Sequence, residues 1–227
     1  MKPFLKKQSK HYKYKKLLYA IFLLLLSSLS ITSAQTSSKT KYSTKAVDLQ
    51  KRAIKYQFNI KDNETQTYSR MLKMLDSATS IEPSYALAYR TKVIPLIKLK
   101  KYNEALVVLR KARSIDPTNL KDLIRQGIIL ESFLNKPNEA KRIYFEAYKQ
   151  ALKYKKGKNN QNPYYDQVVA FNLMFYRGKE EALRYLSNSF KTYTDQKSKE
   201  QMKKLENLLR STPFDAESKI SLLNGNN

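Results

Sequence analysis

The chain of 227 residues contains no cysteine and no tryptophan, and its one histidine is His11. Without cysteine there is no thiolate nucleophile and no thiolate metal ligand. Because histidine is confined to the N-terminal end, the remaining chain has neither a Ser-His arrangement nor a histidine-ligated metal site. The four glycines are too scattered to form a phosphate-binding loop. The sequence therefore predicts no catalytic, cofactor-binding or metal site.

Acidic residues are missing from the first 16 residues, which carry seven lysines. An apolar run follows from Leu17 to Leu26, and a serine-rich stretch leads to Ala34. This order of basic, apolar and small residues is typical of a secretory signal peptide. We predict that residues 1–34 are cleaved near Ala34 and that the mature protein is periplasmic or secreted. The alternative is an uncleaved anchor, which needs about 20 apolar residues.

Positive charge dominates the chain, with 44 basic and 19 acidic residues and a formal net charge of +25. Loss of the seven lysines before Leu17 lowers this charge to +18. For an exported protein the expected partners of such a charge are anionic lipids, acidic glycans and acidic protein segments, and not nucleic acid. A lysine-rich helical surface that serves only solubility explains the same composition.

Two similar phrases, Ala78 to Pro83 and Ala112 to Pro117, lie 34 residues apart. A fixed period of this length predicts copies of one helix–turn–helix unit. Apolar residues recur with the helical period along the chain, and no segment indicates a β-strand. We therefore predict an all-α fold of antiparallel helix pairs.

The return helices share a small residue, a large residue four positions later and a second small residue seven positions after the first. These triplets are Ala105, Leu109 and Ala112; Ala140, Tyr144 and Ala147; and Ala182, Leu186 and Ser189. Antiparallel helices approach closely where side chains are small, and the large residue fills the space between units. Gly127 and Ala170 are the small residues of two outgoing helices, whereas Val93 departs from this pattern and Pro95 is expected to kink its helix.

This pattern resembles the tetratricopeptide repeat (TPR) family. The resemblance implies a stacked α-solenoid whose outgoing helices line a concave groove that binds protein partners. We predict repeat units at about 46–83, 84–117, 118–153 and 163–194, which together form a domain over residues 46–194. Flexible segments are expected at 35–45 and 211–227, polar connections at Asn59–Thr67 and Tyr154–Pro163, and a capping helix at 197–210 that covers the last unit.

One group of TPR proteins clamps the terminal carboxylate of a peptide. It uses a Lys and an Asn in the first unit, an Asn in the second, and a Lys and an Arg in the third. The resemblance places at these positions Lys55 and Asn59, Thr91, and Lys121 and Arg125. Lysine and arginine fixed on a helix bind a carboxylate through charge-assisted hydrogen bonds. Thr91 departs from the pattern, and solvated helix faces explain the same lysines.

Tyrosines close to lysines indicate a second surface, suited to glycans or acidic peptides. They are Tyr85, Tyr89, Tyr144, Tyr148, Tyr164, Tyr165 and Tyr176. Burial in the core, with the hydroxyl reaching water, is the alternative for each of them.

The hypothesis that follows is a non-enzymatic exported scaffold or adaptor, which binds a protein or peptide with an acidic segment or a free C-terminus. The alternative is a basic protein that docks electrostatically on an anionic envelope surface of lipid or glycan. A third possibility is an enzyme that uses carboxylates alone, for example on glycans, but no pair of acidic residues stands out.

Overall fold

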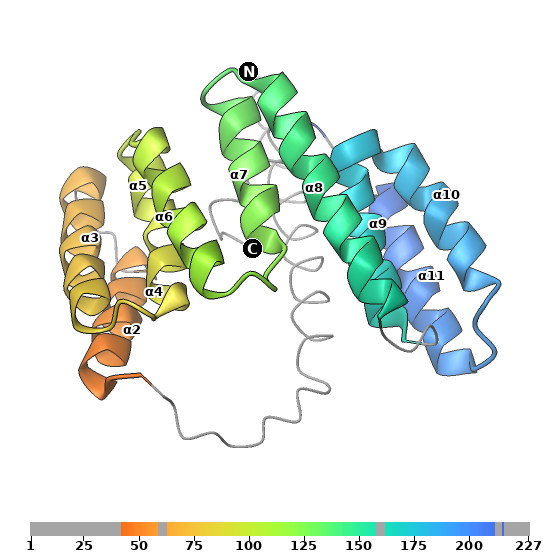
Figure 1. The fold of residues 1–227 in the computed structure, drawn as a ribbon, viewed down its shortest axis with the longest axis horizontal. Coiled ribbons are helices and arrows are strands. Elements are labelled where there is room, and N and C mark those ends of the chain that lie inside the picture. Colours follow the sequence, from red (N-terminus) through yellow and green to blue (C-terminus); the bar gives the residue numbers. More distant parts are fainter. Residues whose placement is uncertain (1–41, 59–62, 158–161, 212–214, 216–227) are drawn as a thin grey trace, which may run out of the picture. The chain divides into compact units, whose positions relative to one another are not determined.

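The computed structural model describes residues 42–58, 63–157, 162–211 and 215. Helices and turns account for these residues, and no strand occurs among them, so the predicted all-α fold is confirmed. The helices, shown in Figure 1, are α2 (Thr44–Phe58), α3 (Glu64–Ile81), α4 (Ala86–Thr91), α5 (Val93–Lys98), α6 (Tyr102–Ile115), α7 (Lys121–Ser132), α8 (Pro137–Lys156), α9 (Pro163–Arg177), α10 (Lys179–Phe190) and α11 (Gln196–Ser211).

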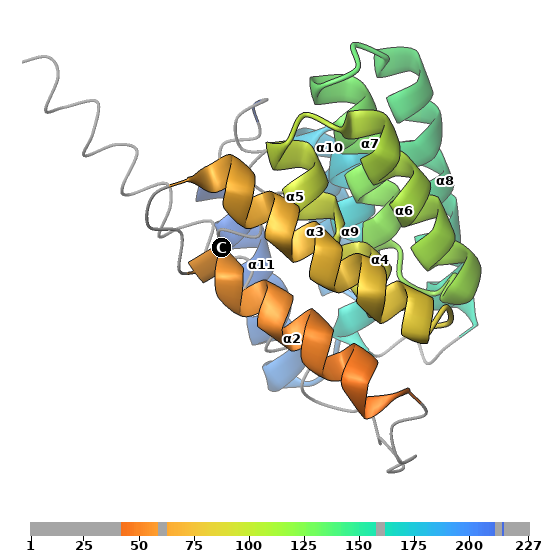
Figure 2. The ribbon, with the colours of Figure 1, turned by 90° about the vertical axis from the view of Figure 1, so that its left-hand side faces the viewer.

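The chain divides into two compact units. In the N-terminal unit, which ends at Ala140, α2 packs against α3, and α6 packs against α4, α5 and α7; α2 and α3 lie side by side in Figure 2. In the C-terminal unit, which begins at Lys141 in α8, α10 packs against α9, and α11 covers both of them. Each unit is thus built from packed helix pairs, as predicted, and α11 is the predicted capping helix.

The small–large–small pattern of the return helices forms the core. Its members are at most 6% exposed: Ala105, Leu109, Ala112, Ala140, Tyr144, Ala147, Ala182, Leu186 and Ser189. Gly127 and Ala170 of the outgoing helices are also buried. Close helix approach at small residues therefore sets the packing, as the sequence predicts.

The outgoing helix of the second pair is interrupted at Lys92, between α4 and α5. Pro95 has no N–H to donate to the carbonyl of Thr91, four residues earlier, so the helix is interrupted where the sequence predicts a kink. The ammonium of Lys92 is held against α3, at 2.8 Å from Asp76 Oδ1 and 2.7 Å from Thr79 Oγ1. These contacts fix the interrupted helix to its neighbour.

Three turns between outgoing and return helices each contain a residue with positive φ. These are Lys100 (φ 60°), Asn135 (φ 52°) and Gly178 (φ 97°). A left-handed residue after the last helical turn lets a backbone N–H reach back to the helix carbonyls, as Lys101 N does to Leu96 O at 2.8 Å. Asparagine and glycine adopt this conformation more readily than lysine does.

Two helices extend into segments that the sequence assigns to connections. The connection ends before Glu64 rather than at Thr67, because Asn63 caps α3 by accepting a hydrogen bond from Gln66 N at 3.0 Å. At the other connection, α8 continues to Lys156, past the expected end at 153. Lysine has a high helix propensity, so a Lys-rich stretch need not end a helix.

Several expectations concern residues outside the described part of the chain. They are the signal peptide at 1–34, the segment 35–41, the site residue Asn59, and the tail apart from Ser211 and Asp215. Of the predicted flexible segment at 35–45, Thr44 and Lys45 already belong to α2. No helix among the described residues has the length and apolarity needed to cross a lipid bilayer.

A buried carboxylate joins the helices of the C-terminal unit. Asp166, in the first turn of α9, is fully buried. Its Oδ1 accepts hydrogen bonds from Lys155 Nζ (2.6 Å), Tyr185 OH (2.5 Å) and Ser189 Oγ (2.8 Å), and its Oδ2 accepts one from Tyr193 OH. Because these donors come from α8, α10 and the turn after α10, one side chain fixes the positions of three segments.

The ionisation of this network follows from its hydrogen bonds. Burial raises the pKa of Asp166, but the hydrogen bonds from Lys155, the two tyrosines and Ser189 together lower it below its usual value. Burial and then the bond to Asp166 raise the pKa of Tyr185 to about 12, and the same causes raise the pKa of Tyr193. Near neutral pH the carboxylate is therefore ionised and both phenols keep the protons that they donate.

Replacement of the central carboxylate tests this role. We expect Asp166→Asn to lower the free energy of unfolding by about 3 kcal/mol, because removing one partner of a buried ion pair leaves the other uncompensated. This loss is at the low end of the range for a broken buried ion pair, because the Lys155 side chain is 24% exposed and water partly compensates its charge. Denaturant unfolding followed by circular dichroism measures it. Glu180→Gln, an exposed acid in the first turn of α10, is the matched control, and an equal loss in both variants would contradict the role.

The same network predicts a pH dependence. A carboxyl whose pKa is lower in the folded than in the unfolded protein adds stability above its unfolded pKa, and this stability is lost as the pH falls through the folded pKa. The usual value for Asp166 is 3.8. We expect the stability difference between wild type and Asp166→Asn to be constant near neutral pH and to shrink in acid below that value. A difference that persists in strong acid would show that the charge is not its source.

Candidate functional site

Polar side chains link the first two outgoing helices of the N-terminal unit. Gln50 on α2 donates from Nε2 to Thr91 Oγ1 (3.1 Å), and its Oε1 accepts from Tyr85 OH (3.3 Å). The Thr91 hydroxyl in turn donates to the carbonyl of Leu87 at 2.8 Å. The hydroxyl of Thr91 is therefore engaged within the protein as both donor and acceptor.

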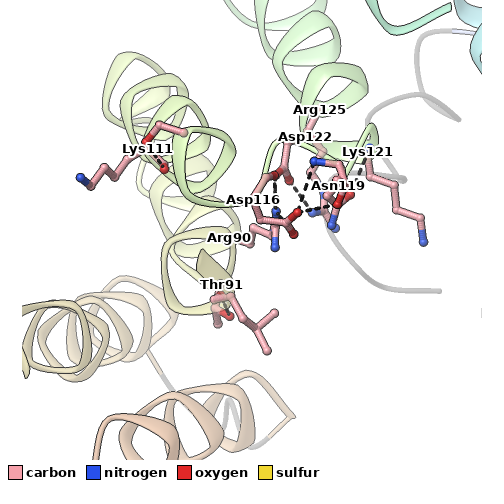
Figure 3. Close-up of polar contacts among 11 residues, drawn as sticks. Arg90, Thr91, Lys111, Asp116, Asn119, Lys121, Asp122 and Arg125 are labelled. Atoms are coloured by element: carbon pink, nitrogen blue, oxygen red, sulfur yellow. Dashed lines mark hydrogen bonds and ion pairs between the residues drawn. The ribbon is translucent and has the colours of Figure 1, made fainter. Parts of the chain in front are cut away.

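An ion cluster links α4 to the start of α7. Arg90 on α4 lies beside Asp116 and Asp122, as Figure 3 shows: its Nη2 is 2.9 Å from Asp116 Oδ2 and its Nε is 2.8 Å from Asp122 Oδ2. Arg90 Nη2 also donates to the backbone carbonyl of Asp116 at 3.3 Å. One guanidinium thus holds the turn before α7 and the first turn of α7 against the preceding repeat.

A second arginine stands farther from the same carboxylate. Arg125 Nη1 is 3.7 Å from Asp122 Oδ1, beyond hydrogen-bonding distance, and this oxygen has no hydrogen-bond partner although Asp122 is 0% exposed. The side chain of Arg125 is 30% exposed. Asp122 is therefore bound tightly by one arginine and loosely by the other.

Charge and burial act in opposite directions on these groups. Burial raises the pKa of Asp122 in spite of its arginines. Burial also acts to raise the pKa of Asp116, but hydrogen bonds from Thr118 and Arg90 outweigh it and lower that pKa. Burial and then the charge of Arg125 lower the pKa of Lys121. An anion placed beside Lys121 and Arg125 would favour their charged forms, and it would thereby offset the cost of burial and their mutual repulsion.

The predicted site residues differ in their surroundings and in their hydrogen-bond partners. Lys121 and Arg125 lie one turn apart on α7, and Figure 3 shows the Lys121 side chain extending away from Asp122. Lys55 is exposed in the last turn of α2. Thr91 is engaged with Gln50, and Asn59 lies outside the described residues. The cationic pair on α7 is thus the part of the predicted set that the structure brings together.

The sequence interpretation did not identify Arg90, Asp116 or Asp122 as a cluster. One signal was available, because Asp122 is an acidic residue between Leu120 and Leu123 at a helix start, and a charge among apolar residues indicates a buried partner. Which arginine supplies that partner depends on how neighbouring repeats approach, and no local pattern gives it.

Two of the tyrosines proposed as a binding surface, Tyr85 and Tyr144, are core residues, as the alternative interpretation expects. The others are half-buried.

The similarities of this chain to known proteins are weak. No family model and no curated protein matches the sequence. Among solved structures, the chain is similar to PilW, a widely conserved type IV pilus biogenesis factor, with 16% identity over 81% of this chain and 88% of that chain and a TM-score of 0.44. It is also similar to a MamA RS-1 ArsTM double mutant, with 13% identity over 74% of this chain and 97% of that chain and a TM-score of 0.41. At these values neither similarity supports a function.

The ion cluster predicts a large effect of losing Arg90. We expect Arg90→Met to lower the free energy of unfolding by about 3–5 kcal/mol, because Asp122 is left buried without its close partner. Arg110→Met, at an exposed position on α6, is the control and should change stability by less than about 0.5 kcal/mol. Denaturant unfolding of both variants measures the difference. The double variant Arg90→Met with Asp122→Leu should regain most of the stability that Arg90→Met loses. If the double variant instead loses as much stability as Arg90→Met and Asp122→Leu lose together, the pairing is contradicted.

Proposed function

We propose that this protein is an exported, non-enzymatic scaffold of the TPR kind, which binds a protein partner through the outgoing helices of its N-terminal unit. The observation that supports this function is the pair of cations on α7. Arg125 is held only loosely by Asp122, at 3.7 Å, and Lys121 forms no ion pair with any acidic side chain of the described residues. Both cations therefore have donors to offer to a ligand.

The ligand chemistry follows from these donors. A guanidinium binds a carboxylate through two parallel hydrogen bonds, and a neighbouring ammonium adds a third donor. Because Arg90 already binds Asp122 at 2.8 Å, Arg125 can turn toward a partner without leaving the buried Asp122 unpaired. An acidic segment or a free C-terminus supplies the carboxylate. Lys55, Asn59 and Thr91 belong to the same proposed face.

Export is proposed from the order of residues in 1–34, and it directs the search for the partner to the cell envelope. The second candidate function, electrostatic docking on an anionic lipid or glycan surface, is favoured by the net charge of +25. The two candidates differ in what they require, because docking depends on the total charge whereas a carboxylate site depends on where the charges stand.

A pair of double variants separates the two functions. We expect Lys121→Gln with Arg125→Gln to weaken the binding of acidic peptides with a free C-terminal carboxylate by at least about tenfold, since each lost charge-assisted hydrogen bond is worth about 1.5–3 kcal/mol. Fluorescence anisotropy of the full-length protein with a labelled peptide library measures this. Glutamine is preferred to glutamate at 125 because a new carboxylate there would face the buried Asp122.

The matched control removes the same number of charges elsewhere. Arg110→Gln with Lys111→Gln changes two exposed positions on α6 and should leave peptide binding unchanged. Equal weakening in both double variants, with binding that collapses as salt is raised, would favour surface docking instead. Unchanged binding in the α7 variant, with helicity intact by circular dichroism, would refute the carboxylate site.

A further inference from the structure

The part of α8 that belongs to the C-terminal unit presents a basic stripe to solvent. Arg142, Phe145, Lys149 and Lys153 follow one another at helical spacing, and all four are exposed. With a rise of 1.5 Å per residue, the stripe is about 16 Å long. No acidic side chain of the described residues forms an ion pair with these three cations. The nearby acid, Glu146, accepts a hydrogen bond from Gln150 Nε2 at 3.1 Å.

Aromatic rings lie in the middle of this stripe. The Phe145 ring is 39% exposed and packs on the Tyr176 ring of α9, with centroids 4.8 Å apart. The Tyr148 ring also stacks on the Tyr176 ring, with centroids 5.8 Å apart. Rings held against one another on two helices form a rigid apolar surface, which loses little conformational entropy when a partner binds.

Two cations are positioned by these rings. Lys149 Nζ lies 5.0 Å from the centroid of Phe145, and Arg177 Cζ lies 5.5 Å from the centroid of Tyr176. Cation–π contacts of this length hold the charges beside the apolar surface. A group that buries Phe145 and Tyr176 therefore meets a positive charge at each ring.

We propose that this face, formed by Arg142, Phe145, Lys149, Lys153, Tyr176 and Arg177, binds an acidic segment of a partner protein that carries an apolar anchor residue. The carboxylates of the segment pair with the cations, and its anchor covers the rings of Phe145 and Tyr176. Aromatic and arginine side chains are enriched in protein interfaces. The face shares no residue with the proposed site at Lys121 and Arg125, so its test does not depend on theirs.

The geometry favours a protein segment over a membrane or a glycan polyanion. A bare polyanion would pair with the cations and leave the rings uncovered. Insertion into a bilayer needs apolar side chains that reach into the acyl boundary. Phe145 instead packs against Tyr176 and beneath Lys149, so its ring is held at the protein surface. Two packed rings with a cation at each complement an acidic helix or strand with one apolar side chain.

The test uses a synthetic peptide of glutamate and alanine with a single phenylalanine as the first peptide. In the second peptide, alanine replaces that phenylalanine. Polyglutamate and vesicles of phosphatidylcholine with phosphatidylglycerol are the other two ligands. Binding to the full-length protein is measured by anisotropy or cosedimentation. We expect Phe145→Ala to weaken binding of the first peptide by about thirtyfold, the smallest loss that marks an interface hot spot. The same substitution should not change binding of the second peptide or of polyglutamate, because both lack the anchor.

Matched variants complete the experiment. Val107→Ala removes an exposed apolar side chain from α6 and should leave peptide binding unchanged. Lys149→Gln with Lys153→Gln should weaken the binding of all acidic peptides more than Arg110→Gln with Lys111→Gln does. Thermal unfolding confirms that each variant is folded. The proposal is overturned if the first peptide fails to bind, if Phe145→Ala leaves its affinity unchanged, or if vesicles bind more tightly than the peptide and depend equally on Phe145.

Discussion

The positions of the helices in each unit depend on a buried aspartate in the first turn of an outgoing helix. Asp122 in α7 and Asp166 in α9 have no solvent exposure, so each must obtain its hydrogen bonds from neighbouring segments. The helix N-terminus favours a negative charge, but it does not offset the full cost of desolvation. The remaining donors come from other helices, and the helices can pack only where those donors reach the carboxylate. Small residues in the return helices allow the helices to pack closely. Among the closely packed arrangements, the aspartates favour the one in which their hydrogen-bond donors are within reach.

The two aspartates are satisfied to different degrees. Asp166 accepts hydrogen bonds from four side chains, and its pKa is lowered. Among the described residues, Arg90 is the one side chain that hydrogen-bonds Asp122, the other carboxylate oxygen has no hydrogen-bond partner, and the pKa of Asp122 is raised. The Asp166 network, in which both carboxylate oxygens accept hydrogen bonds, stabilises the fold and leaves no donor for a ligand. An incomplete network leaves a cation, Arg125, with unused donors, and this is why the proposed carboxylate site lies at α7 and not at α9.

The features that the sequence predicted correctly are those that depend on spacing. The triplets of the return helices, the break before Pro95 and the covering of α9 and α10 by α11 all follow from periodicity or from the covalent structure of proline. The pairing of Arg90 with Asp122, and that of Lys155 with Asp166, did not follow, because a polar partner is chosen by the distance between helices. Thr91 illustrates the same limit: its position in the pattern indicates a ligand contact, whereas its hydrogen bond with Gln50 could not be predicted from spacing.

The large positive charge and the two proposed faces have different roles in binding. Exposed lysines attract any anion over about one Debye length, and the attraction fades with salt, so they raise the rate of encounter without selecting a partner. Selection requires groups that lose water in the complex, because an incorrect partner then leaves them unpaired. Arg125 beside the buried Asp122, and the rings of Phe145 and Tyr176 under Lys149 and Arg177, are groups of this kind. In both proposals the exposed lysines would therefore raise the rate of encounter, and Arg125 and the Phe145–Tyr176 rings would select the ligand.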